Sequence, residues 1–144
     1  MSVAVRRALY GKMAADVTLV ALLGIPATGY TKSIYHQFAP EGAGFPYIVF
    51  NKESGNPSYG FGGRALDDEL WLIKGVDRPV PPSTSTDAVE NIASRLDALL
   101  TDGAISISGY TQRWLRREMD VEYPEEIDGV AYRHAGAQYR LIYR

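Results

Sequence analysis

An amphipathic stretch from Thr86 or Asp87 to Leu100 constrains the fold most. Its apolar side chains recur at intervals of three or four residues, which places them on one face of a helix. These residues are Ala88, Val89, Ile92, Ala93, Leu96, Leu99 and Leu100. Ser85 or Thr86 is the expected N-cap, and Gly103 ends the helix. An apolar stripe of this width needs a surface to cover, so we expect the helix to lie on a β-sheet.

Three segments before this helix have the composition of β-strands. Their side chains are rich in β-branched and aromatic types, or alternate between apolar and polar. They are Ile34–Phe38, Tyr47–Lys52 and Leu66–Lys74. The last is apolar on both faces near its end, which predicts a place in the centre of the sheet.

After the helix, Ile105–Ile107 is predicted as a short strand, and the rest of the chain as a long β-hairpin. Its arms are Tyr110–Tyr123 and Ala131–Tyr143. The sequence PEEIDG between the arms supplies Pro124, Asp128 and Gly129 for the turn.

Two helices are expected before the first strand. Ser2–Ala14 carries an apolar stripe, and Asp16 is a suitable N-cap for Val17–Leu23. We therefore predict an α+β fold: a single antiparallel or mixed sheet of about four to five strands, with two or three helices packed on it. The length of 144 residues fits one domain, spanning residues 1–144.

Composition excludes several classes of function. The net charge of -2 gives no electrostatic basis for gripping nucleic acid. The absence of cysteine excludes disulfides, thiolate metal sites and cysteine nucleophiles. The densest apolar run, Leu19–Ile25, is too short to span a bilayer, so no membrane association is expected.

Motifs for catalysis, cofactors and metals are weak in this sequence. His36 and His134 are isolated, without the spacing of a zinc site. Gly60–Arg64 superficially resembles a phosphate-binding loop, but it leads into a strand and lacks the Lys-Ser/Thr pair. We therefore expect no cofactor, no metal and no enzymatic activity.

Two acidic clusters and a glycine-rich segment leave alternatives open. Asp67-Asp68-Glu69 and Glu125-Glu126-Asp128 could serve acid/base chemistry in a pocket, but neither comes with a partnering His, Lys or metal-ligand pattern. A solvated face or turn is favoured, and for the first cluster the lining of a channel that repels DNA is a third interpretation. Gly55–Gly63 holds four glycines and a proline in nine residues, which predicts a flexible connection without regular structure. It is either mobile or ordered by a neighbouring subunit, through Tyr59, Phe61 and Arg64 at its end.

Arginines are concentrated in the terminal hairpin. They are Arg113, Arg116, Arg117, Arg133, Arg140 and Arg144. Two interpretations are equally supported: cross-strand pairing with Glu118, Asp120 and Glu122, and a basic patch that docks on an acidic subunit surface. In the second, all but Arg144 are candidate contacts.

The order of elements resembles a known family. Ser33-Ile34-Tyr35, Ala39-Pro40-Glu41-Gly42 and Phe45-Pro46-Tyr47-Ile48-Val49-Phe50 are followed by the glycine-rich segment and by a strand ending Trp71-Leu72-Ile73-Lys74-Gly75-Val76. This arrangement is similar to the tail completion, or tail terminator, proteins of long-tailed phages and phage-like gene transfer particles. Departures are Ser33, where the family often has a basic residue, and a long spacer from Arg78 to Ser85.

The resemblance implies a virion protein of the tail or neck, assembled in the cytoplasm of a bacterial host. Members form a ring, usually a homohexamer, that caps the tail tube and joins it to the head-tail connector; they have no catalytic residues. DNA passes through such a ring without sequence-specific binding. The alternatives are another neck (stopper) subunit and, less favoured, a small ligand-binding module or enzyme.

Overall fold

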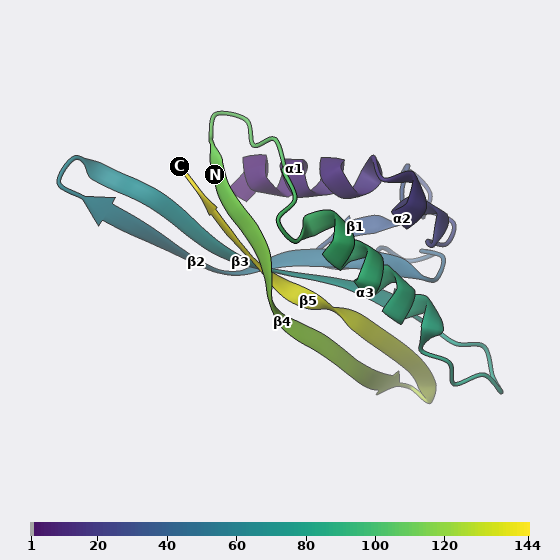
Figure 1. Cartoon of the computed structure of the whole chain (residues 1–144). Coiled ribbons are helices and arrows are strands. Elements are labelled where there is room, and N and C mark those ends of the chain that lie inside the picture. The colour runs from purple at the N-terminus through teal and green to yellow at the C-terminus, as the bar shows by residue number, and fades with distance from the viewer. Residues whose placement is uncertain (1) are drawn as a thin grey trace.

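The computed structural model describes residues 2–144 and shows one five-stranded sheet with helices on one face (Figure 1). Along the chain the elements are α1 (Ser2–Ala14), α2 (Val17–Ala21), β1 (Ile34–His36), β2 (Tyr47–Gly60), β3 (Gly63–Asp77), α3 (Asp87–Leu100), β4 (Gln112–Ile127) and β5 (Val130–Tyr143). The strand order is β1-β2-β3-β5-β4, with β1 parallel to β2 and all other pairs antiparallel. The predicted α+β class is confirmed, and β3 is central.

Helix α3 covers β3 and β5 with the predicted apolar face. Ile92 and Leu96 on this face are fully buried. A close approach is possible because Gly75 of β3 lies beneath the helix: a Cβ atom there would lie 2.9 Å from Ile92 Cγ2. The helix thus sits on the sheet at a distance that any side chain at position 75 would increase.

Helix α1 lies beside α3 on the same face and packs on α2 and β1 (Figure 1). Its predicted stripe of Val5, Leu9 and Met13 is fully buried. Asp16 caps α2 as predicted: Leu19 N–H donates to Asp16 Oδ1 at 2.7 Å. The same carboxylate accepts a hydrogen bond from Arg95 Nε of α3 at 3.1 Å, and this interaction lowers the pKa of Asp16.

The prediction that Gly55–Gly63 lacks regular structure is wrong. β2 continues to Gly60, and β3 begins at Gly63. Cross-strand pairing continues from Gly55↔Glu69 to Gly60↔Gly63, and only Phe61 and Gly62 form the turn. Gly63 has φ +107, which glycine adopts without strain. The prediction from composition failed because pairing with β3 holds these glycines in a strand that they would not form alone.

The predicted strand at Ile105–Ile107 is also wrong. Ile105 N–H donates to the side-chain oxygen of Gln112 at 2.7 Å, and Gln112 Nε2 donates to Gly103 O at 2.8 Å. These bonds hold the segment as a loop. Ile107 is buried, so its apolar character reflects a loop packed on the core.

The C-terminal hairpin is confirmed, with longer strands and a tighter turn than predicted. Asp128 (φ 51) and Gly129 (φ 76) make the turn, and Pro124 lies within β4. Positive φ at both central residues matches the right-handed twist of the strands and suits an Asp-Gly pair. β1 and α2 are slightly shorter than predicted.

We predict that Leu96→Ala lowers the free energy of unfolding by about 2–5 kcal/mol, because it removes a fully buried side chain and leaves a cavity. Chemical denaturation measures this change. Asn91→Ala, on the exposed face of the same helix, is the control and should change stability by less than about 0.5 kcal/mol. A loss below that limit for Leu96→Ala would contradict the packing described.

Candidate assembly surfaces

Two hairpin arms project beyond the part of the sheet that the helices cover. β3 and β5 pair only from Asp67↔Tyr143 to Asp77↔Arg133. The β2–β3 hairpin continues past one end of this pairing as the first arm, residues 54–66. The β4–β5 hairpin continues past the other end, beyond Pro124↔Arg133. Together with the residues at its base, 122–124 and 133–135, it forms the second arm, residues 122–135. Figure 1 shows the arms leaving opposite ends of the molecule.

In each arm, the outer strand has an edge that pairs with no further strand of the described residues. Within residues 2–144, β1 pairs with β2 only at Ile48–Phe50, so the outer edge of β2 is open from Asn51 to Gly60. β4 is the last strand of the sheet, and within the described residues no further strand pairs with its outer edge, although Asp102 N–H of the loop after α3 donates to Leu115 O at 2.8 Å. Open edges of this length are templates for pairing with another chain unless they are protected.

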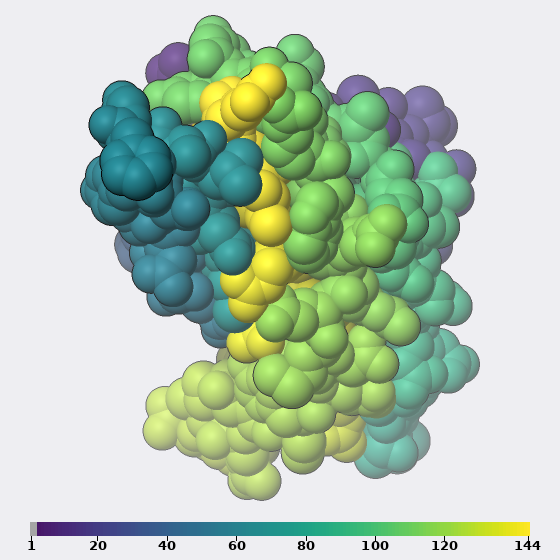
Figure 2. Space-filling view, turned by 60° about the vertical axis from the view of Figure 1, so that its left-hand side comes forward, coloured from purple at the N-terminus to yellow at the C-terminus, as the bar shows by residue number. Residues whose placement is uncertain are grey.

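The first arm carries three predicted contact residues at its tip, which faces the viewer in Figure 2 (dark teal). Tyr59 is 69% exposed and Phe61 completely exposed. Arg64 forms an ion pair with Asp67 at 3.3 Å, and a hydrogen bond with Tyr59 raises the pKa of its guanidinium. Aromatic residues, phenylalanine included, are enriched at protein–protein interfaces.

The base of the first arm is held by a buried carboxylate. Glu69 lies on the same face of β3 as Trp71 and is 3% exposed. Its Oε2 accepts from Trp71 Nε1 at 2.9 Å, and its Oε1 accepts from Tyr143 Oη at 2.9 Å and Lys52 Nζ at 3.0 Å. Burial and this contact raise the pKa of Tyr143. One carboxylate therefore joins β2, β3 and β5 where the arm begins.

This geometry corrects the expectation for the acidic cluster at residues 67–69. Asp67 and Glu69 are buried within the chain, so they do not line a channel. Asp68 lies on the opposite face, where its Oδ1 accepts from Arg140 Nη1 at 2.7 Å. Consecutive residues of a strand point to opposite faces, so the acidic run is divided between two environments.

We predict that Glu69→Gln lowers the free energy of unfolding by about 1–3 kcal/mol, because an amide cannot accept from all three donors. Trp71 fluorescence during chemical denaturation reports the change directly. The control is Glu53→Gln, at an exposed carboxylate that accepts from Gln138. Equal stability of Glu69→Gln and the wild type would show that the network does not hold the arm.

The arginines of the terminal hairpin do not gather into one patch. Arg140 binds both Glu118 oxygens and Asp68, and these bonds raise the pKa of its guanidinium. Arg117 pairs with Asp120 and Asp97, and Arg116 with Asp102. The predicted cross-strand pairing therefore occurs between Arg140 and Glu118, whereas Arg117 and Asp120 pair within β4.

Arg113 and Arg133 differ from these three. Neither has an ion pair in the part of the chain that the structure describes. Arg113 is exposed on β4, close to the start of that strand, and Arg133 lies on the second arm with a buried Nε atom. Of the arginines proposed as contacts on the hairpin, Arg113 is the one that is both exposed and unpaired.

The two histidines lie far apart in the sheet and have separate surroundings. His134 stacks on Tyr123 at 4.4 Å, with its Nε2 atom 3.3 Å from Glu125 Oε1. Burial and the charge of Lys74 lower its pKa, against the opposing effect of Glu125. Burial and Arg6 lower the pKa of His36. Residues 2–144 contain no cluster of three or more side chains suited to hold a metal ion.

Acidification should destabilise the fold through these histidines. Their folded-state pKa values lie below the unfolded value of about 6.5, so the unfolded chain binds more protons as pH falls. The free energy of unfolding should drop between about pH 7.5 and about pH 5.5, and His134→Phe should reduce the drop. Denaturation at several pH values tests this; rising stability on acidification would contradict it.

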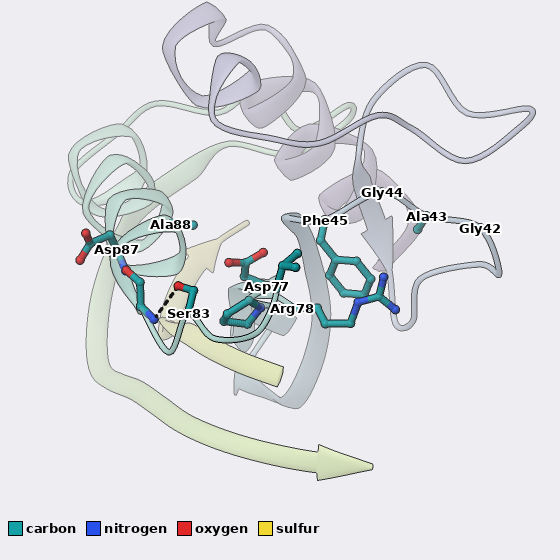
Figure 3. Close-up of a pocket in the computed structure, with 12 residues that line it drawn as sticks. Gly42, Ala43, Gly44, Phe45, Asp77, Arg78, Ser83, Asp87 and Ala88 are labelled. Atoms are coloured by element: carbon teal, nitrogen blue, oxygen red, sulfur yellow. Dashed lines mark hydrogen bonds between the residues drawn. The ribbon is translucent and has the colours of Figure 1, made fainter. Parts of the chain in front are cut away.

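A shallow hollow beside the spacer after β3 contains no catalytic arrangement. About 870 Å³ of space lies between the 42–45 loop, residues 77–80 and the start of α3. Arg78 lies over the Phe45 ring at 5.0 Å. Figure 3 shows the Asp77 and Asp87 carboxylates on either side of Ser83, without convergence on a common point. The lining brings no nucleophile and base together.

Sequence reasoning did not identify a groove between α1 and β1. It has a volume of about 450 Å³ and a mostly apolar lining that includes Tyr10, Ile34 and Phe50, with Arg6 and Arg7 at its side. His36 also lines the groove. Asp67 and Asp68 do not, so the groove does not bring this histidine together with the acidic run of β3. The absence of acidic residues from Ser2–Ala14 was the sequence feature that could have indicated this groove. It indicates a basic groove only once the place of β1 beside the helix is known.

The sequence matches no protein-family model and none of the curated proteins. Solved structures nevertheless share the fold. One is from the virion of the native gene transfer agent (GTA) particle, with a TM-score of 0.72, 14% identity, and coverage of 95% of this chain and 93% of that chain. Another, known only by a sequence identifier, has a TM-score of 0.60, 13% identity, and coverage of 98% and 95%.

These comparisons show a fold that extends over nearly the whole chain. At such low identity, neither comparison transfers residues or a role. No helix in residues 2–144 has the length and apolarity to cross a membrane.

Proposed function

We propose that this chain is a structural subunit of a phage-like virion, and that its copies associate head-to-tail in a ring. The observation that carries the proposal is the pair of arms at opposite ends of one sheet, each with an open edge. A contact between unlike surfaces at opposite ends of a subunit generates either a closed ring or an open filament. The fold shared with a protein of the GTA particle supports a place in a virion.

Within that class, a tail terminator is the role we favour. The ring, of six copies by resemblance to that family, caps the tail tube and joins it to the head-tail connector in the neck, after assembly in the bacterial cytoplasm. DNA passes through it without sequence-specific contacts. In this role the protein acts by shape and has no enzymatic step.

The proposed contacts follow from the placement of the exposed residues. Tyr59 and Phe61 at the tip of the first arm reach beyond the body and contact an adjoining copy or the tail tube. Arg113 offers an unpaired charge close to the start of β4. The paired arginines join neighbouring segments of the sheet, and each surface pair contributes only about a few tenths of a kcal/mol.

We predict that the wild-type protein forms a closed oligomer, alone at high concentration or on purified tail tubes, and that deleting residues 59–62 prevents this without unfolding the chain. Light scattering and native mass spectrometry give the oligomer size, and circular dichroism the folding. Val80→Ala, at an exposed site away from both arms, is the control. A wild-type chain that stays monomeric at high concentration and does not assemble on tail tubes would contradict the proposal.

A stopper subunit in the same neck is the second candidate, because such parts have a similar size and location. Electron microscopy of labelled particles separates the two. A terminator lies on the tube side of the joint, and a stopper lies on the connector side.

A further inference from the structure

The tip of the second arm combines acidic and apolar groups. Residues 122–130 hold four carboxylates, at Glu122, Glu125, Glu126 and Asp128, and no cation. At the turn, Ile127 and Val130 face each other across the strands and are 51% and 37% exposed. An apolar pair surrounded by negative charge is complementary to an apolar surface with basic residues around it.

The α1–β1 groove has the complementary character. Its floor is apolar and aromatic, formed by residues such as Tyr10, Ile34 and Phe50. The two segments that supply most of the lining, residues 2–14 and 29–36, contain Arg6, Arg7, Lys12 and Lys32 and no carboxylate. Neither Arg6 nor Arg7 forms an ion pair within residues 2–144.

The two surfaces cannot meet within one chain. α1 packs on α2 and β1, whereas the second arm extends from the far end of the β4–β5 hairpin. In Figure 1 the turn of that hairpin lies well away from α1. One chain cannot bring these two complementary surfaces together. Two copies can, because a head-to-tail contact places the arm of one copy against the groove of the next.

We propose that the tip of the second arm of one copy seats in the α1–β1 groove of the next copy. Ile127 and Val130 enter the apolar floor, and Glu126 and Asp128 pair with Arg6 and Arg7. This inference rests on the proposed ring and names the surfaces that close it. The apolar contact contributes affinity, and the charged pairs fix the register and direction of the contact around the ring.

Charge reversal tests the pairing. Glu126→Lys with Asp128→Lys, and separately Arg6→Glu with Arg7→Glu, should each reduce the oligomer to monomers in native mass spectrometry. Combining all four substitutions should restore the wild-type mass, because the charges are again complementary. The control, Glu41→Lys with Glu90→Lys, changes the net charge as much as Glu126→Lys with Asp128→Lys but outside both surfaces, and it should leave the mass unchanged.

Cross-linking gives a second measurement that does not depend on charge. The chain has no cysteine, so introduced pairs report without background. Thr31→Cys in the groove with Ile127→Cys in the arm should give, on oxidation, a ladder of covalent multimers up to the ring size. Ser106→Cys with Ile127→Cys, which places the first thiol on an exposed loop outside the groove, should give none.

The outcomes separate this inference from the proposed function. Rings that persist in both reversal variants and do not cross-link through the groove would overturn the docking and leave the ring intact. A wild-type chain that never assembles would overturn both. Loss of assembly in each reversal variant, rescue in the combination and a groove-specific ladder would establish the contact.

Discussion

The register of β3 against β5 is the constraint on which the rest of the structure depends. These strands share eleven residue pairs, from Asp67↔Tyr143 to Asp77↔Arg133, and each belongs to a hairpin longer than that overlap. The offset sends one hairpin past each end of the covered sheet. Because a one-residue slip would turn every buried side chain outward, the register is set by the core, and the arms are its consequence.

Side-chain contacts hold the bases of the two arms. Glu69 gathers donors from β2, β3 and β5 at the base of the first arm, and His134 of β5 stacks on Tyr123 of β4 at the base of the second. Between them, Gly75 allows α3 to lie close on β3. Rigid bases and exposed tips are suited to a protein whose surfaces must meet a partner in a fixed geometry.

Much of the fold could be predicted from periodicity. The stripe of α3, the cap at Asp16 and the central place of β3 follow from local chemistry, and the structure confirms them. The strand through residues 55–60 could not be predicted, because its glycines are held by cross-strand pairing. The predicted strand at Ile105–Ile107 was wrong because apolar residues also occur in loops that pack on a core.

The candidate assembly surfaces were harder to predict from the sequence than the fold was. Tyr59 and Phe61 were predicted as contacts on a flexible connection, whereas the structure places them at the end of a hairpin, and the meaning of the charges was not predicted. Asp67, Asp68 and Glu69 are adjacent in sequence and divided by the sheet, and Arg140 finds its acidic partners on two other strands. The basic groove at Arg6 and the acidic tip at Glu126 are far apart in sequence, and only the fold shows that they do not meet within one chain.

Hydrogen exchange of the backbone amides tests the central claim, that copies of the chain associate through their arms, most directly. The exchange of residues 51–62 and 122–130 is compared between dilute monomer and concentrated, assembled protein. The account predicts strong slowing in these two segments on assembly, with little change in α3, which is already buried. Equal exchange of both arms in the two states would contradict it.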